Sequence, residues 1–339
     1  MSDQTQATGA AESEPVRWGV LSTANIGLRA VLPAIIAARN SQPVAIASRE
    51  LAAAERVAAD VPGMRAYGSY EALLDDPAIE VVYIPLPNAL HAEWTIRAAR
   101  AGKHVLCEKP LGATPEQVRE MEAVCREQGV LLMEAFMYRF HPQIRWTLKQ
   151  IAAGAIGRPS LLRGAFSFDI RERPGDIRLR GALAGGALMD VGCYPLNFSR
   201  AVFGGKPQAV AARVDVPADS EVEQTTAAVL DFGGGRLAVI DASFQQPGYQ
   251  LAEVVGDGGR ITLPQPYLPG LSQAEVRIER GDETLVKRFA PVSHYVFEVE
   301  HVAESVRGGA PLLLAPEDAI EQAEAIEMIY AAAGYQRPW

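Results

Sequence analysis

Short apolar runs alternate with helical patterns through the first half of the chain. The runs are VRWGVLS, PVAIAS, EVVYIPL, HVLCEKP and VLLMEA, and helical spacing recurs between them over about residues 25–38, 51–60, 89–101 and 114–128. Strands that alternate with helices of about 10–15 residues form right-handed βαβ units and a parallel sheet. The pattern therefore predicts a doubly wound α/β domain over residues 16–140.

The pattern changes after a predicted helix near residues 142–152. Longer strand-like runs follow without helices between them: SLLRGAFSF, QAVAARVDV, TTAAVLDF, RLAVIDASF, GRITL, AEVRIER and TLVKRF. Hairpin turns are predicted at Gly233 to Gly235 and at Gln245 to Gly248, which favours a mostly antiparallel sheet. A helix over about 316–333, ended by Gly334, closes the chain. We predict a second α/β domain over residues 141–339 and a mobile tail over 1–15.

Size and charge narrow the class of protein. With 339 residues and 36.4 kDa, the chain is larger than a single hydrophobic core usually supports. The net charge of -9, without a dense basic cluster, argues against a nucleic-acid partner. No apolar run approaches the roughly 18 residues of a membrane span. Small molecules are the expected partners.

The three cysteines, Cys107, Cys125 and Cys193, are odd in number and lack CxxC spacing. They suggest neither a disulfide framework nor a zinc site, and we expect no metal. The polar, acidic N-terminus has no basic segment followed by an apolar one, as a secretory signal would have. We therefore expect a cytoplasmic protein.

The first strand-to-helix turn is GVLSTANIG, residues 19–27. Aligned with G-x-G-x-x-G, it places Ser22, Ala24 and Gly27 at the three glycine positions, so small residues replace two of the glycines. In a dinucleotide-binding fold this turn holds the pyrophosphate at the N-terminus of the first helix. A turn without a ligand is the alternative interpretation. Contacts with the cofactor are assigned to Ser22, Thr23, Ala24, Asn25 and Ile26.

The second strand ends at Ser48 and Arg49, where an NAD-binding domain would have an acidic residue for the ribose hydroxyl. A hydroxyl and a guanidinium group favour a 2'-phosphate instead, because arginine offers planar paired donors to phosphate oxygens. The sequence therefore predicts NADP. Glu50 leaves use of both cofactors open, and a solvated Arg49 is the alternative.

Polar residues follow two further strands of the predicted sheet. Asn88 and His91 come after one strand, and Glu108 and Lys109 after the next, where Pro110 ends the pairing. Ligands of open α/β sheets bind beyond the carboxyl ends of the strands, so these side chains are expected to face one crevice. His91 has two interpretations, a donor near the cofactor or substrate and a histidine packed between domains.

Four segments carry a resemblance to the Gfo/Idh/MocA family over about residues 16–330. They are GVLSTANIG, the stretch from YGSYEALLDD to HVLCEKPLG, LLMEAFMYRFHPQ and GGALMDVGCYPLN. Within the family, the sequence is most similar to the branch of glucose-fructose oxidoreductase, pentose dehydrogenases, dihydrodiol dehydrogenase and keto-sugar reductases. The resemblance implies a Rossmann domain followed by an α/β domain whose large open sheet forms a homodimer or higher homo-oligomer.

The resemblance also implies site residues. The catalytic lysine of the E-K-P motif is Lys109, and a second motif places Asp190 and Tyr194 beside the substrate. The tyrosine, in place of a histidine, argues against an inositol dehydrogenase. Further expected contacts are Leu86, Asn88, His91, Glu108, Lys109, Arg178 and Tyr295 with cofactor, and Lys109, Arg139, Asp190 and Tyr194 with substrate. Ordinary packing or surface roles are the alternatives for Arg139, Arg178 and Tyr295.

The predicted chemistry is oxidation of a sugar hydroxyl. Loss of hydride to NADP must accompany loss of the hydroxyl proton. Tyr194 is the expected acid/base, with a pKa lowered from about 10 by the ammonium of Lys109; Lys109 as the acid/base is the alternative. We expect a cyclic aldose to be oxidised at C1 to the lactone, in one variant with tightly bound NADP(H) that a second sugar re-oxidises. Keto-sugar reduction, dihydrodiol oxidation and a non-catalytic dinucleotide or sugar sensor are the other hypotheses.

Overall fold

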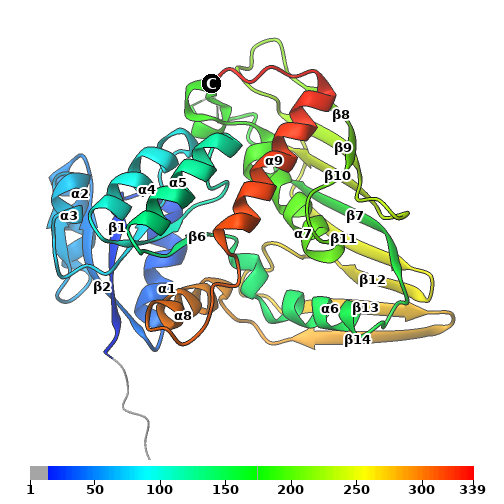
Figure 1. Cartoon of the computed structure of the whole chain (residues 1–339), viewed down its shortest axis with the longest axis horizontal. Coiled ribbons are helices and arrows are strands. Elements are labelled where there is room, and N and C mark those ends of the chain that lie inside the picture. Colours follow the sequence, from blue (N-terminus) through cyan, green and yellow to red (C-terminus); the bar gives the residue numbers. More distant parts are fainter. Residues whose placement is uncertain (1–13, 174) are drawn as a thin grey trace, which may run out of the picture.

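The computed structural model describes residues 14–173 and 175–339. Most of the predicted tail therefore lies outside the described residues. Two sheets lie side by side in Figure 1, one in each half of the chain. Within the described residues, no helix is both long and apolar enough to cross a membrane.

The first sheet is parallel, with the order β3-β2-β1-β4-β5-β6. Its strands are β1 (Val16–Leu21), β2 (Ser41–Ala47), β3 (Arg65–Tyr67), β4 (Val81–Ile84), β5 (His104–Cys107) and β6 (Leu132–Glu134). Strands β1, β4 and β5 are almost entirely buried, as expected when helices cover both faces. This strand order is that of the Rossmann fold and confirms the prediction for the first half.

Helices connect these strands at the four places that the apolar pattern predicts, and one further short helix over Tyr70–Leu74 was not predicted. They are a π-helical turn η1 (Gly27–Val31) continuing into α1 (Leu32–Ala37), then α2 (Leu51–Ala59), α3 (Tyr70–Leu74), η2 (Asn88–Leu90), α4 (His91–Arg100) and α5 (Pro115–Glu127). Thr114 caps α5 by accepting a hydrogen bond from the N–H of Gln117, at 3.3 Å. The Gln117 side chain returns to the N–H of Ala113, at 2.9 Å. The predicted start of this helix is confirmed.

The second sheet has eight strands in the order β14-β13-β12-β11-β7-β10-β9-β8. Its strands are β7 (Pro159–Ser167), β8 (Ala209–Asp215), β9 (Thr225–Asp231), β10 (Leu237–Ser243), β11 (Tyr249–Gly256), β12 (Gly259–Leu263), β13 (Ala274–Arg280) and β14 (Glu283–Phe289). All neighbouring pairs are antiparallel except β7 with β10. The mostly antiparallel sheet is confirmed.

One of the two predicted hairpins is wrong. Gly233 to Gly235 connect β9 to β10, which pair as antiparallel neighbours. Residues 245–248 also connect consecutive strands, but β7 lies between β10 and β11 and pairs with both. The turn residues specify a reversal of the chain. They do not specify whether a strand from elsewhere inserts between its two arms.

Helices cover one face of the second sheet. They include α6 (Pro142–Ala152), α7 (Cys193–Phe203) and α9 (Pro316–Ala333). A short helix, η3 (Met137–Phe140), precedes α6. Side chains alternate between the two faces along each strand, so Leu230 and Ile240 are buried while Val229 and Val239 remain 43% and 44% exposed. Helix α8 (His294–Val306) turns back and packs against α1 and β2 of the first half.

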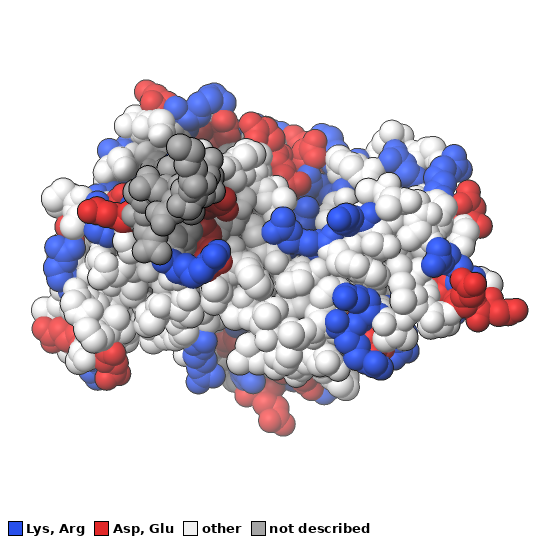
Figure 2. Space-filling model, turned by 90° about the horizontal axis from the view of Figure 1, so that it is seen from below, with Lys and Arg blue, Asp and Glu red and all other residues white. Residues whose placement is uncertain are grey.

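Charged residues form no continuous basic surface on the face seen in Figure 2. Lys and Arg side chains there are interspersed with acidic and uncharged residues. Mixed surface charge of this kind lacks the concentrated cations that neutralise a nucleic-acid backbone.

Candidate active site

A cavity of about 950 Å³ lies where the two halves meet. The first half contributes the turn after β1, the segment after β4 and the residues that follow β5. The second half contributes the end of β7 and residues 175–178, which run into the short helix η4 (Ile177–Leu179). It also contributes the helix made of η6 (Leu188–Gly192) and α7. The carboxyl ends of the parallel strands thus open into the cavity, as the sequence predicts.

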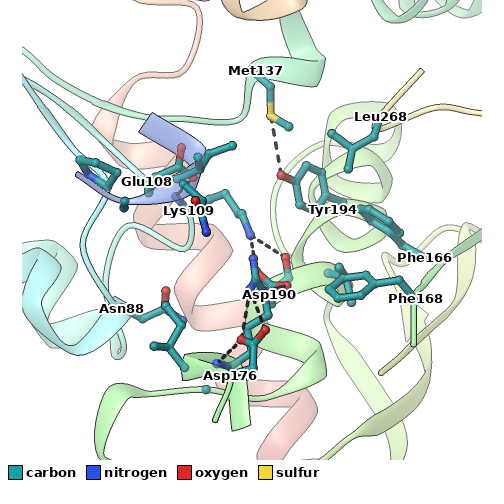
Figure 3. A pocket seen from close by; sticks show the side chains of 18 of the residues that line it. Asn88, Glu108, Lys109, Met137, Phe166, Phe168, Asp176, Asp190, Tyr194 and Leu268 are labelled. Carbon is teal, nitrogen blue, oxygen red and sulfur yellow. Dashed lines mark hydrogen bonds and ion pairs between the residues drawn. The ribbon is translucent and has the colours of Figure 1, made fainter. Parts of the chain in front are cut away.

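Lys109 connects the two halves at the centre of this cavity. Its ammonium group donates hydrogen bonds to the carbonyl oxygen of Asp190 at 2.7 Å and to Oδ1 at 2.8 Å. It also lies over the ring of Tyr194, 5.2 Å from the centroid. Figure 3 shows Lys109 reaching toward Asp190 with Tyr194 beside them. Residues from two distant motifs therefore form one cluster.

Arg178 completes the charge arrangement around Asp190. Its Nε donates to Oδ2 of Asp190 at 2.7 Å, and its terminal nitrogen contacts Asp176 at 3.2 Å. Burial favours a neutral Asp190, but the charges of Lys109 and Arg178 outweigh it and lower its pKa to about 2. For Lys109 too, burial opposes the charge, yet Asp190 raises the pKa above its usual value. Both groups are ionised at neutral pH.

Tyr194 differs from the sequence prediction. Burial is the largest cause that raises its pKa well above 10, whereas we expected Lys109 to lower it. The ammonium lies over the ring face, and the hydroxyl instead points to Sδ of Met137, at 3.6 Å. The expected lowering is therefore wrong for this arrangement. Tyr194 is a neutral phenol at neutral pH.

Glu108 lines the cavity beside Lys109. The hydroxyl of Tyr83, on β4, donates to its Oε1 at 2.6 Å. Burial raises the pKa of Glu108, although Lys109 and Tyr83 act in the opposite direction. Tyr295 of α8 also lines the cavity. The end of β5, where two charged residues follow a buried strand, therefore faces a ligand-sized space, as the sequence predicts.

The first turn has a glycine-like backbone conformation at Ser22, one of the two positions where a small residue replaces a glycine of the motif. Ser22 has a φ of 142°, a value that side chains rarely adopt, and its Oγ accepts the N–H of Ala24 at 3.0 Å. Ala24, Asn25 and Ile26 line the cavity, and so do Leu86 and Asn88 after β4.

The structure places six predicted contact residues away from the cavity wall: Ser22, Thr23, Ser48, Arg49, His91 and Arg139. His91 is fully buried, and its ring nitrogens lie 2.9 and 2.8 Å from the carbonyl oxygens of Pro110 and Leu86. It therefore holds the two strand-end segments together. His91 is packed, but both of its partners lie in the first half of the chain and not between the domains. Arg139 donates to Asn197 of α7 at 3.1 Å. Ser48 accepts the N–H of Glu50, and Arg49 is exposed beyond β2.

Two family models match the chain. The model described as "Oxidoreductase family, NAD-binding Rossmann fold" covers residues 16–136, and the GFO/IDH/MocA C-terminal domain covers residues 144–262. A D-xylose 1-dehydrogenase (NADP(+)) from Haloferax volcanii is 38% identical over 93% of this chain and 97% of its own length. The chain belongs to the GFO/IDH/MocA family.

Two solved structures of oxidoreductases have the same fold over nearly the whole chain. A 3-ketoreductase from Actinomadura kijaniata, in complex with NADP and TDP-benzene, gives a TM-score of 0.88 at 33% identity and covers 94% of this chain and 98% of its own. An aldose-aldose oxidoreductase from Caulobacter crescentus, complexed with glycerol, gives 0.86 at 27% identity, covering 95% and 98%. These relatives bear out the predictions of an oxidoreductase and of NADP as its cofactor.

Sequence reasoning missed several residues of this GFO/IDH/MocA site. Phe166 and Phe168 line the cavity from the end of β7, and Asp176 fixes Arg178. The alternation in AFSF, with both phenylalanines on one face of a strand, was a usable signal for the first two. Residues 248–250 at the start of β11 also line the cavity, together with residues 264–265 and Leu268 after β12. Their approach to the cavity depends on the order of strands in the second sheet.

Proposed function

We propose that the protein is an NADP-dependent sugar dehydrogenase that oxidises a cyclic aldose at C1 to the lactone. The observation that carries this proposal is the cluster of Lys109, Asp190 and Tyr194 in a cavity at the carboxyl ends of the Rossmann strands. A cation beside the reacting oxygen stabilises alkoxide character as hydride leaves the carbon.

The chain has suitable residues for NADP. The turn at Ala24 to Ile26 faces the cavity with the first helix behind it, which suits a pyrophosphate. Arg49 is exposed just past β2, where a ribose 2'-phosphate is bound in this fold. When bound, NADP supplies the hydride acceptor. Glu108 and Tyr295 would then flank the nicotinamide, and Lys109, Asp190 and Tyr194 would orient the sugar.

Charge around the cavity favours an uncharged sugar. Among the described residues that line it, the cations are Lys109 and Arg178, and both are already paired with carboxylates. A sugar phosphate or a nucleotide-linked sugar would lose water around its phosphates without gaining an unpaired cation there. Phe166 and Phe168 offer an apolar surface to the C–H groups of a sugar ring.

The first experiment is to identify the cofactor and the reaction together. Protein is denatured, released NADP(H) is quantified by absorbance and mass, and a panel of aldoses is assayed at 340 nm with added NADP. Steady NADPH formation with an aldose and lactone as product supports the dehydrogenase. Stoichiometric bound NADP(H), with little NADPH released until a second sugar is added, supports the variant in which one sugar is oxidised and another reduced. No oxidation of any aldose contradicts the proposal.

Keto-sugar reduction is the second candidate, and one observation favours it. Lys109 and Tyr194 both have raised pKa values and hold their protons at neutral pH. Protonated groups are poised to donate to a carbonyl oxygen, whereas oxidation needs a base. The same panel, extended to keto-sugars and dihydrodiols with NADPH or NADP, separates these activities.

A further inference from the structure

A buried carboxyl group holds the beginning of the helix that carries Asp190 and Tyr194. Oε1 of Glu223 accepts a hydrogen bond from the N–H of Leu188 at 2.8 Å. The backbone carbonyl oxygen of Glu223 accepts another from the N–H of Ala187 at 3.0 Å. These N–H groups belong to the first turn of the helix, where backbone N–H groups have no acceptor within the helix itself. Glu223 is fully buried and does not line the cavity.

Two glycines bring this carboxyl group close to the backbone of Arg178. A Cβ at Gly186 would lie 2.3 Å from Oε2 of Glu223, and one at Gly185 would lie 2.2 Å from the carbonyl oxygen of Arg178. The N–H of Gly186 donates to that same carbonyl at 2.9 Å. Glu223 therefore packs against the segment between Arg178 and the helix of Asp190, and this segment positions both members of the Arg178–Asp190 ion pair.

A third contact ties the carboxyl group to the core of the molecule. The hydroxyl of Tyr330, on α9, donates to Oε1 at 3.0 Å, and α9 also packs against α5 of the first half and α7 of the second. Burial is the largest cause that raises the pKa of Glu223 to about 8. The group is therefore mostly neutral at pH 7, and a glutamine is a close substitute for it in shape and charge.

We propose that Glu223 is a positioning residue for catalysis. Its Oε1 fixes the first turn of the helix, and the helix in turn sets the position of Asp190 against Lys109 and the orientation of Tyr194. The geometry needed is an acceptor at Oε1, not a charge. This role is independent of which sugar is used, since it concerns the shared site.

The test compares Glu223→Gln, which keeps the acceptor, with Glu223→Ala, which leaves the N–H of Leu188 and the hydroxyl of Tyr330 without one. Glu221→Ala is the matched control, because Glu221 accepts the N–H of Gly181 in the same segment but does not contact the helix. Each variant is assayed with whichever substrate supports turnover by the wild type. The readouts are kcat, KM, the NADP dissociation constant, and the isotope effect for substrate deuterated at the reacting carbon.

For Glu223→Ala we expect kcat to fall by about 10- to 100-fold, since small displacements of reacting groups are costly. The deuterium isotope effect should rise as hydride transfer becomes rate-limiting. NADP affinity should stay within about twofold of wild type, because the turn between β1 and the first helix is untouched. Glu223→Gln and Glu221→Ala should stay near wild type.

Two results would overturn the proposal: wild-type kcat in Glu223→Ala, or equal losses in the alanine and glutamine variants. If circular dichroism shows that Glu223→Ala is unfolded, Glu223→Asp, which withdraws the carboxyl group by one methylene, replaces it with the same expectations. Absence of aldose oxidation by the wild type would contradict the proposed function alone, since the comparison then uses a keto-sugar or dihydrodiol.

Discussion

The ammonium of Lys109 lies 2.8 Å from the carboxylate of Asp190, although 81 residues separate them in the chain. Asp190 is held from the other side by Arg178, and its pKa of about 2 keeps it charged. The carboxylate therefore fixes the lysine and supplies the counter-charge that keeps it protonated. At the scale of the residue, catalysis depends on this buried cation.

Replacing Lys109 by methionine should lower kcat by about 100-fold or more, because the cation that stabilises developing negative charge is lost. NADP affinity should change by only a few-fold. Steady-state assays and a fluorescence titration with NADPH measure the two quantities. Lys149→Met is the control, since this lysine is exposed on α6. Equal kcat in the two variants would rule out a catalytic role for Lys109.

The rate of sugar oxidation should rise with pH. The proton must go to Lys109 or Tyr194, and both have pKa values above their usual ones. Below a pKa, the deprotonated fraction grows tenfold per pH unit, so log(kcat/KM) should increase with a slope near 1 between about pH 7 and 9. Reduction, which uses the protonated forms, should be flat over that range. A plateau of the oxidation rate already at pH 7 would contradict this assignment.

At the scale of the element, the ends of strands determine the site. Strand β1 ends in a turn whose Ser22 adopts a φ of 142°, and β5 ends at Glu108 and Lys109. The carboxyl ends of parallel strands lie at one edge of the sheet, so residues far apart in sequence share one crevice. Sequence reasoning located these ends well, because buried strands and capped helices are local patterns.

The end of β2 should decide the choice of cofactor. Replacing Arg49 by alanine should raise the dissociation constant of NADP about 10- to 100-fold, as expected for loss of a charged hydrogen bond, and leave that of NAD unchanged. Isothermal titration with both cofactors measures this. Arg56→Ala, an exposed substitution on the neighbouring α2, is the control. A similar loss of affinity for NAD and NADP would show that Arg49 does not bind the 2'-phosphate.

At the scale of the whole molecule, the helices of the described residues that pack on the second sheet lie on one face of it and leave the other face uncovered. Val229 and Val239 lie opposite each other on β9 and β10 of that face and remain exposed. Exposed apolar rows on a large sheet are typical of interfaces between protein chains. We propose that a second copy of the chain covers this face.

Light scattering coupled to size exclusion should therefore give twice the chain mass of 36.4 kDa, or a higher multiple. Val229→Asp should shift the mass toward one chain, because a carboxylate buried at the interface loses its water. Leu313→Asp, an exposed apolar position between α8 and α9, should leave the mass unchanged. A wild-type mass of one chain would contradict the proposal.

Most secondary-structure elements and the motifs of this protein follow from local patterns in its sequence. Periodicity, caps and turn residues act over a few neighbouring positions, so the Rossmann half, the start of α5 and the polar strand ends could all be read from it. Resemblance to the family then supplied Lys109, Asp190 and Tyr194 as a set. Each of these predictions depends on residue type at short range or on a motif.

The contacts that those residues make depend on how the chain packs. The insertion of β7 between β10 and β11, the burial of His91 between two carbonyl groups and the position of Lys109 over the ring of Tyr194 all depend on segments distant in sequence. The direction of the pKa shift of Tyr194 reversed for the same reason, because burial and the orientation of a neighbouring charge are properties of the packed chain. Local patterns carry no information about either.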